Sequence, residues 1–361
     1  MTSTQSLKPA IAPTLATVNS NGSDSDRLDL DRRLQLMREQ PSGLVAYNPT
    51  GNDFVMVEKV DHQLRLVLIN QASLTSELIQ SAIDLENPLQ LVAQSHQVMT
   101  LGLLFADQPQ RLYMVGFGAG VFPTILRQCF PDLAIESSEI LPELVELAQT
   151  YFGVVLDEQL QVAIAEGRSY LEQQPATQKF DLILIDAFLS NGYVSFRLAT
   201  QEFYRCCQTH LTPDGVVIVN LLANDPYLEA KVNTIQAAFH QVFWCELAVG
   251  NYVFFATNQT ELDCAQLLVR AQAMQIQCPD PCAWVDWAAQ LKVGAEFKCG
   301  QACTGSSEQA EVNSEILRDE QPPADYFETL PVFNTLFSKV REDSPCPCGS
   351  GQLFSSCHGK R

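Results

Sequence analysis

The stretch Leu112-Tyr113-Met114-Val115-Gly116-Phe117-Gly118-Ala119-Gly120 decides the fold of this chain. Its first four residues form a continuous apolar run, which is typical of a strand buried on both faces of a parallel sheet. Glycines after such a strand let the backbone turn sharply into a helix and approach a ligand closely. Val121 stands where a dinucleotide fingerprint has its third glycine. We therefore expect Gly116, Gly118 and Gly120 to bind an adenosyl-sulfonium ligand rather than NAD.

Strands and helices are expected to alternate from this point onward. The apolar runs predict strands at 112–115, 133–137, 160–164, 182–185 and 216–221, and the patterns between them predict helices at 121–129, 142–151, 200–210 and 226–239. Trp244–Val249 and Tyr252–Thr257, separated by Gly250-Asn251, predict a closing antiparallel hairpin. The order indicates an α/β fold with a Rossmann-like class I methyltransferase sheet.

The remainder of the chain divides around this sheet. Three apolar runs at 44–47, 54–60 and 64–69 predict an antiparallel β meander, followed by a helix at 89–104. We expect the following domains: 1–40, a disordered leader with a short helix at 27–39; 41–110, the meander plus helix; 111–258, the adenosyl-sulfonium-binding domain; 259–340, a helical and Cys-rich extension with an acidic linker; and 341–361, a zinc knuckle.

Acidic residues follow three successive strands behind the glycine loop. Glu139 stands after the second strand, where it can accept hydrogen bonds from ribose hydroxyls. Glu166 and Gly167 follow the third strand, where an acid can receive an adenine amino group. Asp186 ends the fourth strand, at the carboxyl edge where open sheets bind ligands. Each acid alone is also compatible with a helix cap, but together they favour a nucleoside site.

The C-terminus carries a separate metal-binding pattern. Cys346, Cys348, Cys357 and His358 fall within thirteen positions, and Gly349-Ser350-Gly351 lets the backbone reverse between the two pairs. Three thiols and an imidazole suit one tetrahedral Zn2+ ion, whose binding would also supply folding energy. The segment resembles the SEC-C motif, which implies a docking module for a protein partner rather than a catalytic site.

Residues 44–257 resemble the polyamine aminopropyltransferases, the spermidine synthase family, and more closely their divergent spermidine synthase-like relatives. Besides the glycine loop and the N-terminal meander, the stretches that carry the resemblance are Gln80–Leu85, Glu139-Ile140, Asp181–Asp186 and Leu198–Tyr204. The resemblance implies decarboxylated S-adenosylmethionine as donor and an amine as acceptor. It implies that Asp186 is the catalytic base, that Gln80 and Asp84 face the acceptor, and that the glycine loop, Glu139 and Glu166 hold the nucleoside.

The chain departs from the family pattern at three places. Leu189 stands where the family repeats an aspartate three residues after the first, and Leu141 replaces the second acid of the ribose motif. Asp84-Leu85-Glu86-Asn87-Pro88 has no matching tyrosine in the run before the sheet. Two alternatives therefore stay open: a methyltransferase that uses S-adenosylmethionine itself, and a non-catalytic nucleoside-binding scaffold or adaptor that acts through its zinc knuckle.

Composition limits the possible partners. The 361 residues include 42 Asp and Glu against 22 Lys and Arg, a net charge of −20, which argues against nucleic acid. The sequence shows no export signal and no long apolar run, and the placement of its cysteines indicates reduced thiols. We therefore expect a cytoplasmic protein without a membrane segment. A homo-oligomer is compatible with the resemblance.

Several cysteines and histidines receive no firm role. A second metal at Cys278, Cys282, Cys299 and Cys303 stays open, with free thiols as the default. No function is assigned to His62, His96, His210 or His240.

Overall fold

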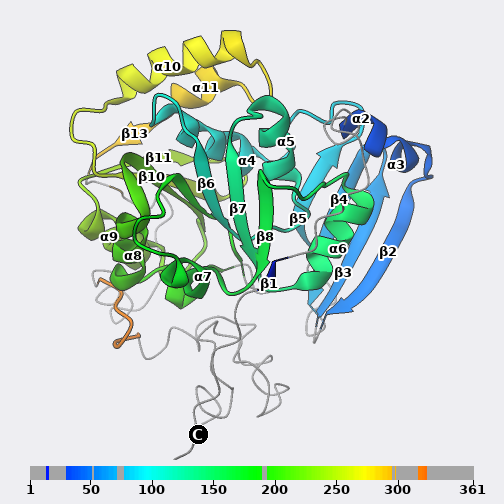
Figure 1. Ribbon diagram of the computed structural model, residues 1–361, viewed down its shortest axis with the longest axis horizontal. Coiled ribbons are helices and arrows are strands. Elements are labelled where there is room, and N and C mark those ends of the chain that lie inside the picture. Colours follow the sequence, from blue (N-terminus) through cyan, green and yellow to red (C-terminus); the bar gives the residue numbers. More distant parts are fainter. Residues whose placement is uncertain are drawn as a thin grey trace, which may run out of the picture.

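Nine strands of the central sheet are defined in the computed structural model, which describes residues 14–15, 30–50, 53–70, 77–188, 193–294, 297 and 316–322 (Figure 1). Their order is β1-β8-β7-β6-β9-β10-β12-β11-β13. The parallel centre consists of β6 (Arg111–Val115), β7 (Ala134–Glu139), β8 (Leu160–Ile164), β9 (Phe180–Ile185) and β10 (Leu211–Leu222). The antiparallel strands are β1 (Thr14–Leu15), β11 (Gln241–Glu246), β12 (Asn251–Thr257) and β13 (Lys292–Val293). The expected Rossmann-like sheet with its closing hairpin is confirmed.

Both faces of this sheet are covered, as the continuous apolar strands predict. In β6, Leu112 and Met114 enter one core with α5 (Val121–Cys129) and α6 (Pro142–Tyr151). Tyr113 and Val115 point to the other core, which holds α7 (Gly167–Gln173), α8 (Gln201–His210) and α9 (Leu228–Ala238). Alternate residues of one strand thus reach opposite faces. Helix α7 has no counterpart among the helices expected from the sequence.

The N-terminal sheet is antiparallel, as expected, but it has four strands rather than three. They are β2 (Gly43–Thr50), β3 (Asp53–Val60), β4 (Gln63–Asn70) and β5 (Glu77–Asp84). In Figure 1 this sheet, drawn in blue, lies to one side of the central sheet beside α6. The extra strand matters for the site because β5 carries Gln80 and Ser81.

Two helices expected near the N-terminus are shorter than the sequence pattern indicated. The expected helix 89–104 is α4 (Gln94–Met99) followed by a 3-10 turn, η1 (Thr100–Leu104). Leu91 instead forms a β-bridge with Ile83, which keeps the residues before α4 out of the helix. The expected helix 27–39 is divided at Leu34 into α2 (Leu30–Arg33) and α3 (Gln35–Glu39).

The C-terminal extension packs on the central domain through α10 (Cys264–Gln277) and α11 (Trp284–Ala288), which cross the top of Figure 1. Trp284 is fully buried and meets Phe130 edge-on, with ring centroids 6.2 Å apart. Arg270 donates hydrogen bonds to the carbonyl oxygens of Leu104 and Phe105 at 2.7 and 3.0 Å. None of the helices that the structure describes combines the length and apolar character needed to cross a bilayer. The zinc knuckle expected at 341–361 lies outside the described residues.

Candidate active site

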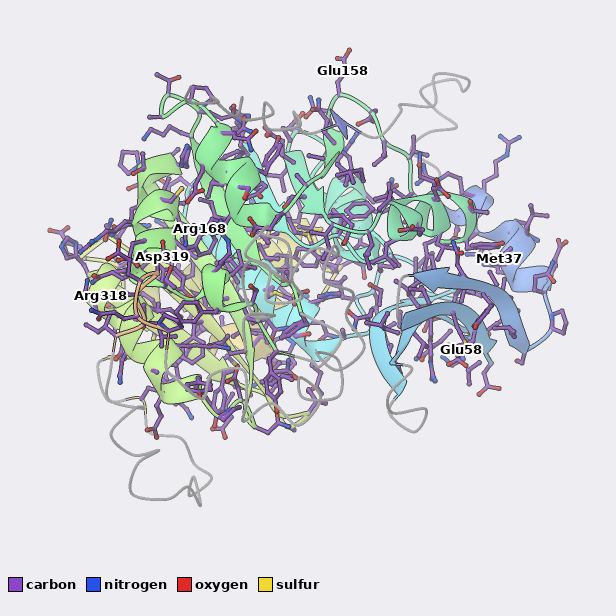
Figure 2. All side chains as sticks on the ribbon, turned by 90° about the horizontal axis from the view of Figure 1, so that it is seen from below. Met37, Glu58, Glu158, Arg168, Arg318 and Asp319 are labelled. Atoms are coloured by element: carbon purple, nitrogen blue, oxygen red, sulfur yellow. The ribbon has the colours of Figure 1, made fainter. Side chains whose placement is uncertain are left out.

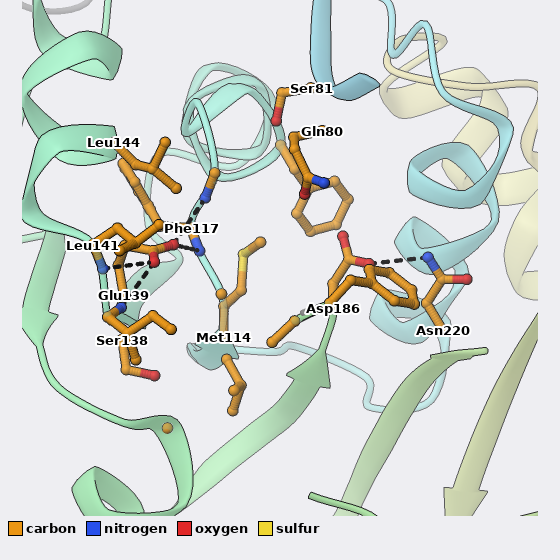
Figure 3. A pocket seen from close by; sticks show the side chains of 18 of the residues that line it. Gln80, Ser81, Met114, Phe117, Ser138, Glu139, Leu141, Leu144, Asp186 and Asn220 are labelled. Carbon is orange, nitrogen blue, oxygen red and sulfur yellow. Dashed lines mark hydrogen bonds between the residues drawn. The ribbon is translucent and has the colours of Figure 1, made fainter. Parts of the chain in front are cut away.

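A cavity of about 360 Å3 lies between the N-terminal sheet and the carboxyl ends of the central strands (Figure 3). Strand β5 contributes Gln80 and Ser81 from one side, and the loops after β6, β7, β8 and β9 contribute from the other. Open α/β sheets bind ligands at this edge. In Figure 3, Glu139 and Leu141 lie at one end of the cavity, and Asp186 and Asn220 lie at the other. We call these the glycine-loop end and the aspartate end.

The glycine loop adopts a backbone that requires glycine. Gly116, Gly118 and Gly120 have φ of +89°, +56° and +64°, in the left-handed region that side chains disfavour. A Cβ on Gly116 would lie 2.6 Å from the carbonyl oxygen of Asp186. Gly116 and Gly118 line the cavity, whereas Gly120 precedes α5 and does not. Glycine is therefore required in this loop by the left-handed backbone and, at Gly116, by the close approach of the residue that follows β9.

Glu139, the last residue of β7, binds the glycine loop itself. One carboxylate oxygen accepts from the amides of Phe117 and Gly118 at 3.1 and 3.3 Å, and the other accepts from Ile140 and Leu141 at 2.8 and 3.0 Å. Burial raises the pKa of this carboxyl group, although the four amide hydrogen bonds act in the opposite direction. The Glu139 side chain lines the cavity. Binding of ribose hydroxyls by this side chain stays a prediction.

Glu166 serves as the cap of α7. Its carboxylate accepts from the amides of Arg168 and Ser169 at 3.1 and 2.9 Å, and Arg197 lies 3.7 Å away. Glu166 and Gly167 both line the cavity. A Cβ on Gly167 would come within 2.3 Å of a methyl group of Val115, so close packing on β6 demands glycine here. The amides of α7 already engage both carboxylate oxygens of Glu166. Adenine recognition by Glu166 stays a prediction.

Asp186 is held by side chains rather than by the backbone. Its Oδ2 lies 3.1 Å from Nε2 of His96, and its Oδ1 accepts from Nδ2 of Asn220 at 2.9 Å. Asn251 donates in turn to Oδ1 of Asn220 at 2.9 Å. The side chains of His96 and Asp186 are only 9% and 11% exposed, and both line the cavity. A carboxylate oriented in this way can accept a proton from a bound nucleophile.

Sequence reasoning missed three partners of this aspartate end and one of the glycine loop. His96 received no role, and Asn220 and Asn251 were not considered, because α4, β10 and β12 supply them from distant parts of the chain. Ser81 accepts from the amide of Ala119 at 3.2 Å and so ties β5 to the glycine loop. No local pattern marks any of these contacts.

The two residues expected to face the acceptor are separated by the structure. Gln80 lines the cavity. The β4–β5 register shifts next to it, since Leu66 pairs with Ser81 but Val67 pairs with Ile79. Bulges of this kind re-aim side chains toward sites. Asp84 is not among the cavity residues: its carboxylate accepts from the amides of Glu86 and Asn87 and lies 3.6 Å from His62.

The described residues contain no group of three or more side chains arranged to hold a metal. Burial raises the pKa of Cys282 to about 12 and also raises that of Cys278. Cys278 donates to the carbonyl oxygen of Asp280 at 2.7 Å. Cys299, Cys303 and all four knuckle residues lie outside the described residues.

Comparisons with known proteins agree with both resemblances. The spermine/spermidine synthase domain matches residues 126–256, and the SEC-C motif matches residues 344–360. A polyamine aminopropyltransferase of Chromobacterium violaceum is 27% identical over 172 residues, which cover 47% of this chain and 65% of the relative. A bovine protein named eEF1A lysine and N-terminal methyltransferase is 27% identical over 204 residues, or 51% of this chain and 29% of the relative.

The fold itself has a solved counterpart. A probable spermidine synthase from Corynebacterium glutamicum superposes with a TM-score of 0.57 at 15% identity, covering 79% of this chain and 98% of that one. This likeness confirms the class I methyltransferase-like fold with its N-terminal sheet. The chain spans less than two thirds of the length of the curated relatives described above. The resemblance to the spermidine synthase family and the SEC-C motif is confirmed.

Proposed function

We propose that this chain transfers an aminopropyl group from decarboxylated S-adenosylmethionine to an amine. The observation that carries the proposal is the Asp186 carboxylate, fixed between His96 and Asn220 in the same cavity as the glycine loop. Family likeness supports it, since the matched domain is the spermine/spermidine synthase domain and the relative from Chromobacterium violaceum is a polyamine aminopropyltransferase.

The charge of the cavity supports the decarboxylated donor. Three carboxylates line it, those of Glu139, Glu166 and Asp186, and none of the described residues that line it is Lys or Arg. S-adenosylmethionine carries a carboxylate that these three carboxylates would repel, whereas the decarboxylated form carries two positive charges. A site with this balance favours the more cationic ligand.

In the proposed reaction, the lone pair of the acceptor nitrogen attacks the carbon next to the sulfonium. The carbon–sulfur bond breaks, and its electron pair passes to sulfur, which leaves as a thioether. The proton lost by nitrogen is accepted by Asp186, while the contacts from His96 and Asn220 keep both carboxylate oxygens oriented. Closely held dipoles of this kind act without reorganising during the reaction.

Calorimetry with the full chain tests the donor. We expect binding of decarboxylated S-adenosylmethionine at least tenfold tighter than binding of the carboxylated form. The reverse preference would support methyl transfer, the alternative that the bovine relative's name suggests. Absence of binding to both ligands would favour a non-catalytic adaptor.

We also propose that Cys346, Cys348, Cys357 and His358 bind one structural Zn2+ ion and that the knuckle docks a protein partner. The donor set of three sulfur atoms and one imidazole nitrogen fits zinc. The motif match at residues 344–360 supports the assignment. The free thiols of the described cysteines support a cytoplasmic location.

A further inference from the structure

The cavity has an apolar wall, which the N-terminal sheet supplies. Val55, Leu66, Leu68 and Ile79 of the N-terminal sheet line the cavity together with Gln80. Ile79 is 53% exposed, an unusual state for a large aliphatic side chain that faces a cavity. A ligand that reaches Asp186 through this region would contact hydrocarbon.

Among the described residues that line the cavity, Asp186 is the one carboxylate placed to hold a cationic acceptor. Glu139 is engaged by four backbone amides at the glycine-loop end, and Glu166 caps α7 and faces Arg197. Asp84 points away from the cavity into its own turn.

These features discriminate between two kinds of amine. An α,ω-diamine bound through one nitrogen at Asp186 would place its second ammonium group against the apolar wall. A charge removed from water without a partner is strongly disfavoured. An amine with a hydrocarbon body would instead bury that body on the same wall, which is favourable.

We propose that the acceptor has a single basic nitrogen on an apolar body rather than two terminal amines. The inference rests on the proposed aminopropyl transfer, and the atoms balance as described above: the new carbon–nitrogen bond replaces the carbon–sulfur bond. Asp186 takes the proton, and the apolar wall selects the acceptor.

The test compares hexylamine with putrescine as acceptors, with the full chain, decarboxylated donor and thioether release as the readout. We expect kcat/KM to be at least tenfold higher for hexylamine. Equal or better use of putrescine would overturn the acceptor class but leave aminopropyl transfer standing. Donor binding without thioether release from either amine would overturn the transfer itself.

A matched pair of variants tests the wall directly. Ile79→Asp adds a carboxylate at a half-exposed position, and we expect it to shift the kcat/KM ratio toward putrescine by tenfold or more. Ile79→Asn removes the same apolar surface without adding charge and should not favour putrescine. An identical ratio in both variants would contradict the role of the wall.

A different observation carries a second inference, about the segment Ile316–Pro322. Leu317 is 1% exposed, and its amide donates to Oγ1 of Thr234 at 2.8 Å. The Asp319 carboxylate receives two hydrogen bonds from the Arg168 guanidinium, at 2.7 and 2.5 Å, and one from Thr200 at 2.7 Å. Figure 2 shows Asp319 beside Arg168, on the side of the molecule opposite Glu58 of the N-terminal sheet.

Arg168 connects this segment to the cavity. It directly follows Gly167, which lines the cavity, and it also donates to the carbonyl oxygen of Arg197 at 3.2 Å. Ser195 and Leu198, which precede and follow Arg197 in sequence, line the cavity. We infer that Ile316–Pro322 is a latch that packs on α7, α8 and α9 and holds the nearby cavity wall in place.

Trypsin cleavage after Arg318 and calorimetric donor affinity test the latch in the full chain. We expect Asp319→Asn to speed this cleavage at least fivefold and to weaken donor binding severalfold. Glu320→Gln, which removes the same charge at an exposed neighbouring position, should change neither. Unchanged cleavage in Asp319→Asn would overturn the latch, and faster cleavage with unchanged donor affinity would overturn its link to the cavity.

Discussion

The two ends of the cavity hold their carboxylates by different means. Glu139 is surrounded by four backbone amides, from the glycine loop and from its own turn. Asp186 is held by the side chains of His96 and Asn220, which α4 and β10 contribute. Backbone amides are supplied by any sequence that forms the turn, whereas side-chain partners depend on particular residues. The glycine-loop end is thus suited to a constant donor, and the aspartate end to chemistry and acceptor choice.

Loss of the Asp186 carboxylate should have the largest effect. We expect Asp186→Asn to lower kcat by about 10^2- to 10^4-fold, because the amide cannot accept the proton of the attacking amine. Donor affinity and the melting temperature should change little, since the glycine-loop end is untouched. Steady-state kinetics and calorimetry measure the two quantities. Unchanged turnover would remove Asp186 from the mechanism.

The contact from His96 should come next. We expect His96→Leu to lower kcat roughly 10- to 100-fold, because leucine cannot contact the carboxylate through a hydrogen bond and loss of such a bond to a charged group is worth about 1.5–3 kcal/mol. His62→Leu is the matched control, because His62 pairs with Asp84 outside the cavity. Equal effects of the two changes would show that the aspartate end does not depend on its side-chain partner.

Changes at Glu139 should affect donor binding and stability rather than kcat. In Glu139→Gln a single oxygen remains as acceptor, so one pair of amides loses its partner, which costs about 1–3 kcal/mol of unfolding free energy. Denaturant titration and donor calorimetry measure the effect. A loss of kcat at saturating donor, with affinity unchanged, would contradict the division of roles between the two ends.

The pH dependence at Glu139 has a definite sign. Because burial raises its pKa in the folded protein, the folded state holds this proton more tightly than the unfolded chain does. The resulting stabilisation is present below the ordinary glutamate pKa and is lost as pH rises through the raised value. Unfolding free energies measured across this range should show the trend in the wild type and lose this component in Glu139→Gln.

The zinc knuckle should leave both ends of the cavity unaffected. We expect the double change Cys346→Ser and Cys348→Ser to reduce bound zinc by one equivalent, with donor affinity unchanged. Metal analysis of the purified protein gives the stoichiometry. Unchanged zinc content would show that these cysteines are not ligands.

Much of the glycine-loop end can be predicted from the amino-acid sequence. The glycine loop, its strand and Glu139 lie within thirty residues, and their order along the chain indicates a nucleoside site. The four-stranded N-terminal sheet was underestimated because the sequence pattern did not reveal β5. Glu166 was expected to bind a ligand, although as the cap of α7 its carboxylate is already engaged. A helix cap and a ligand-binding acid have the same sequence signature after a strand.

The sequence by itself determined the alternating sheet, the glycine loop and the position of Asp186 at a strand end, because these depend on local periodicity and on backbone conformations that only glycine adopts readily. Tertiary structure alone decided what surrounds Asp186. His96 is 90 residues away in sequence, and Asn220 is 34 away. It also brought the apolar wall of the N-terminal sheet into the same cavity and turned Asp84 away. Such contacts arise when separate elements pack together, and no short-range pattern records them.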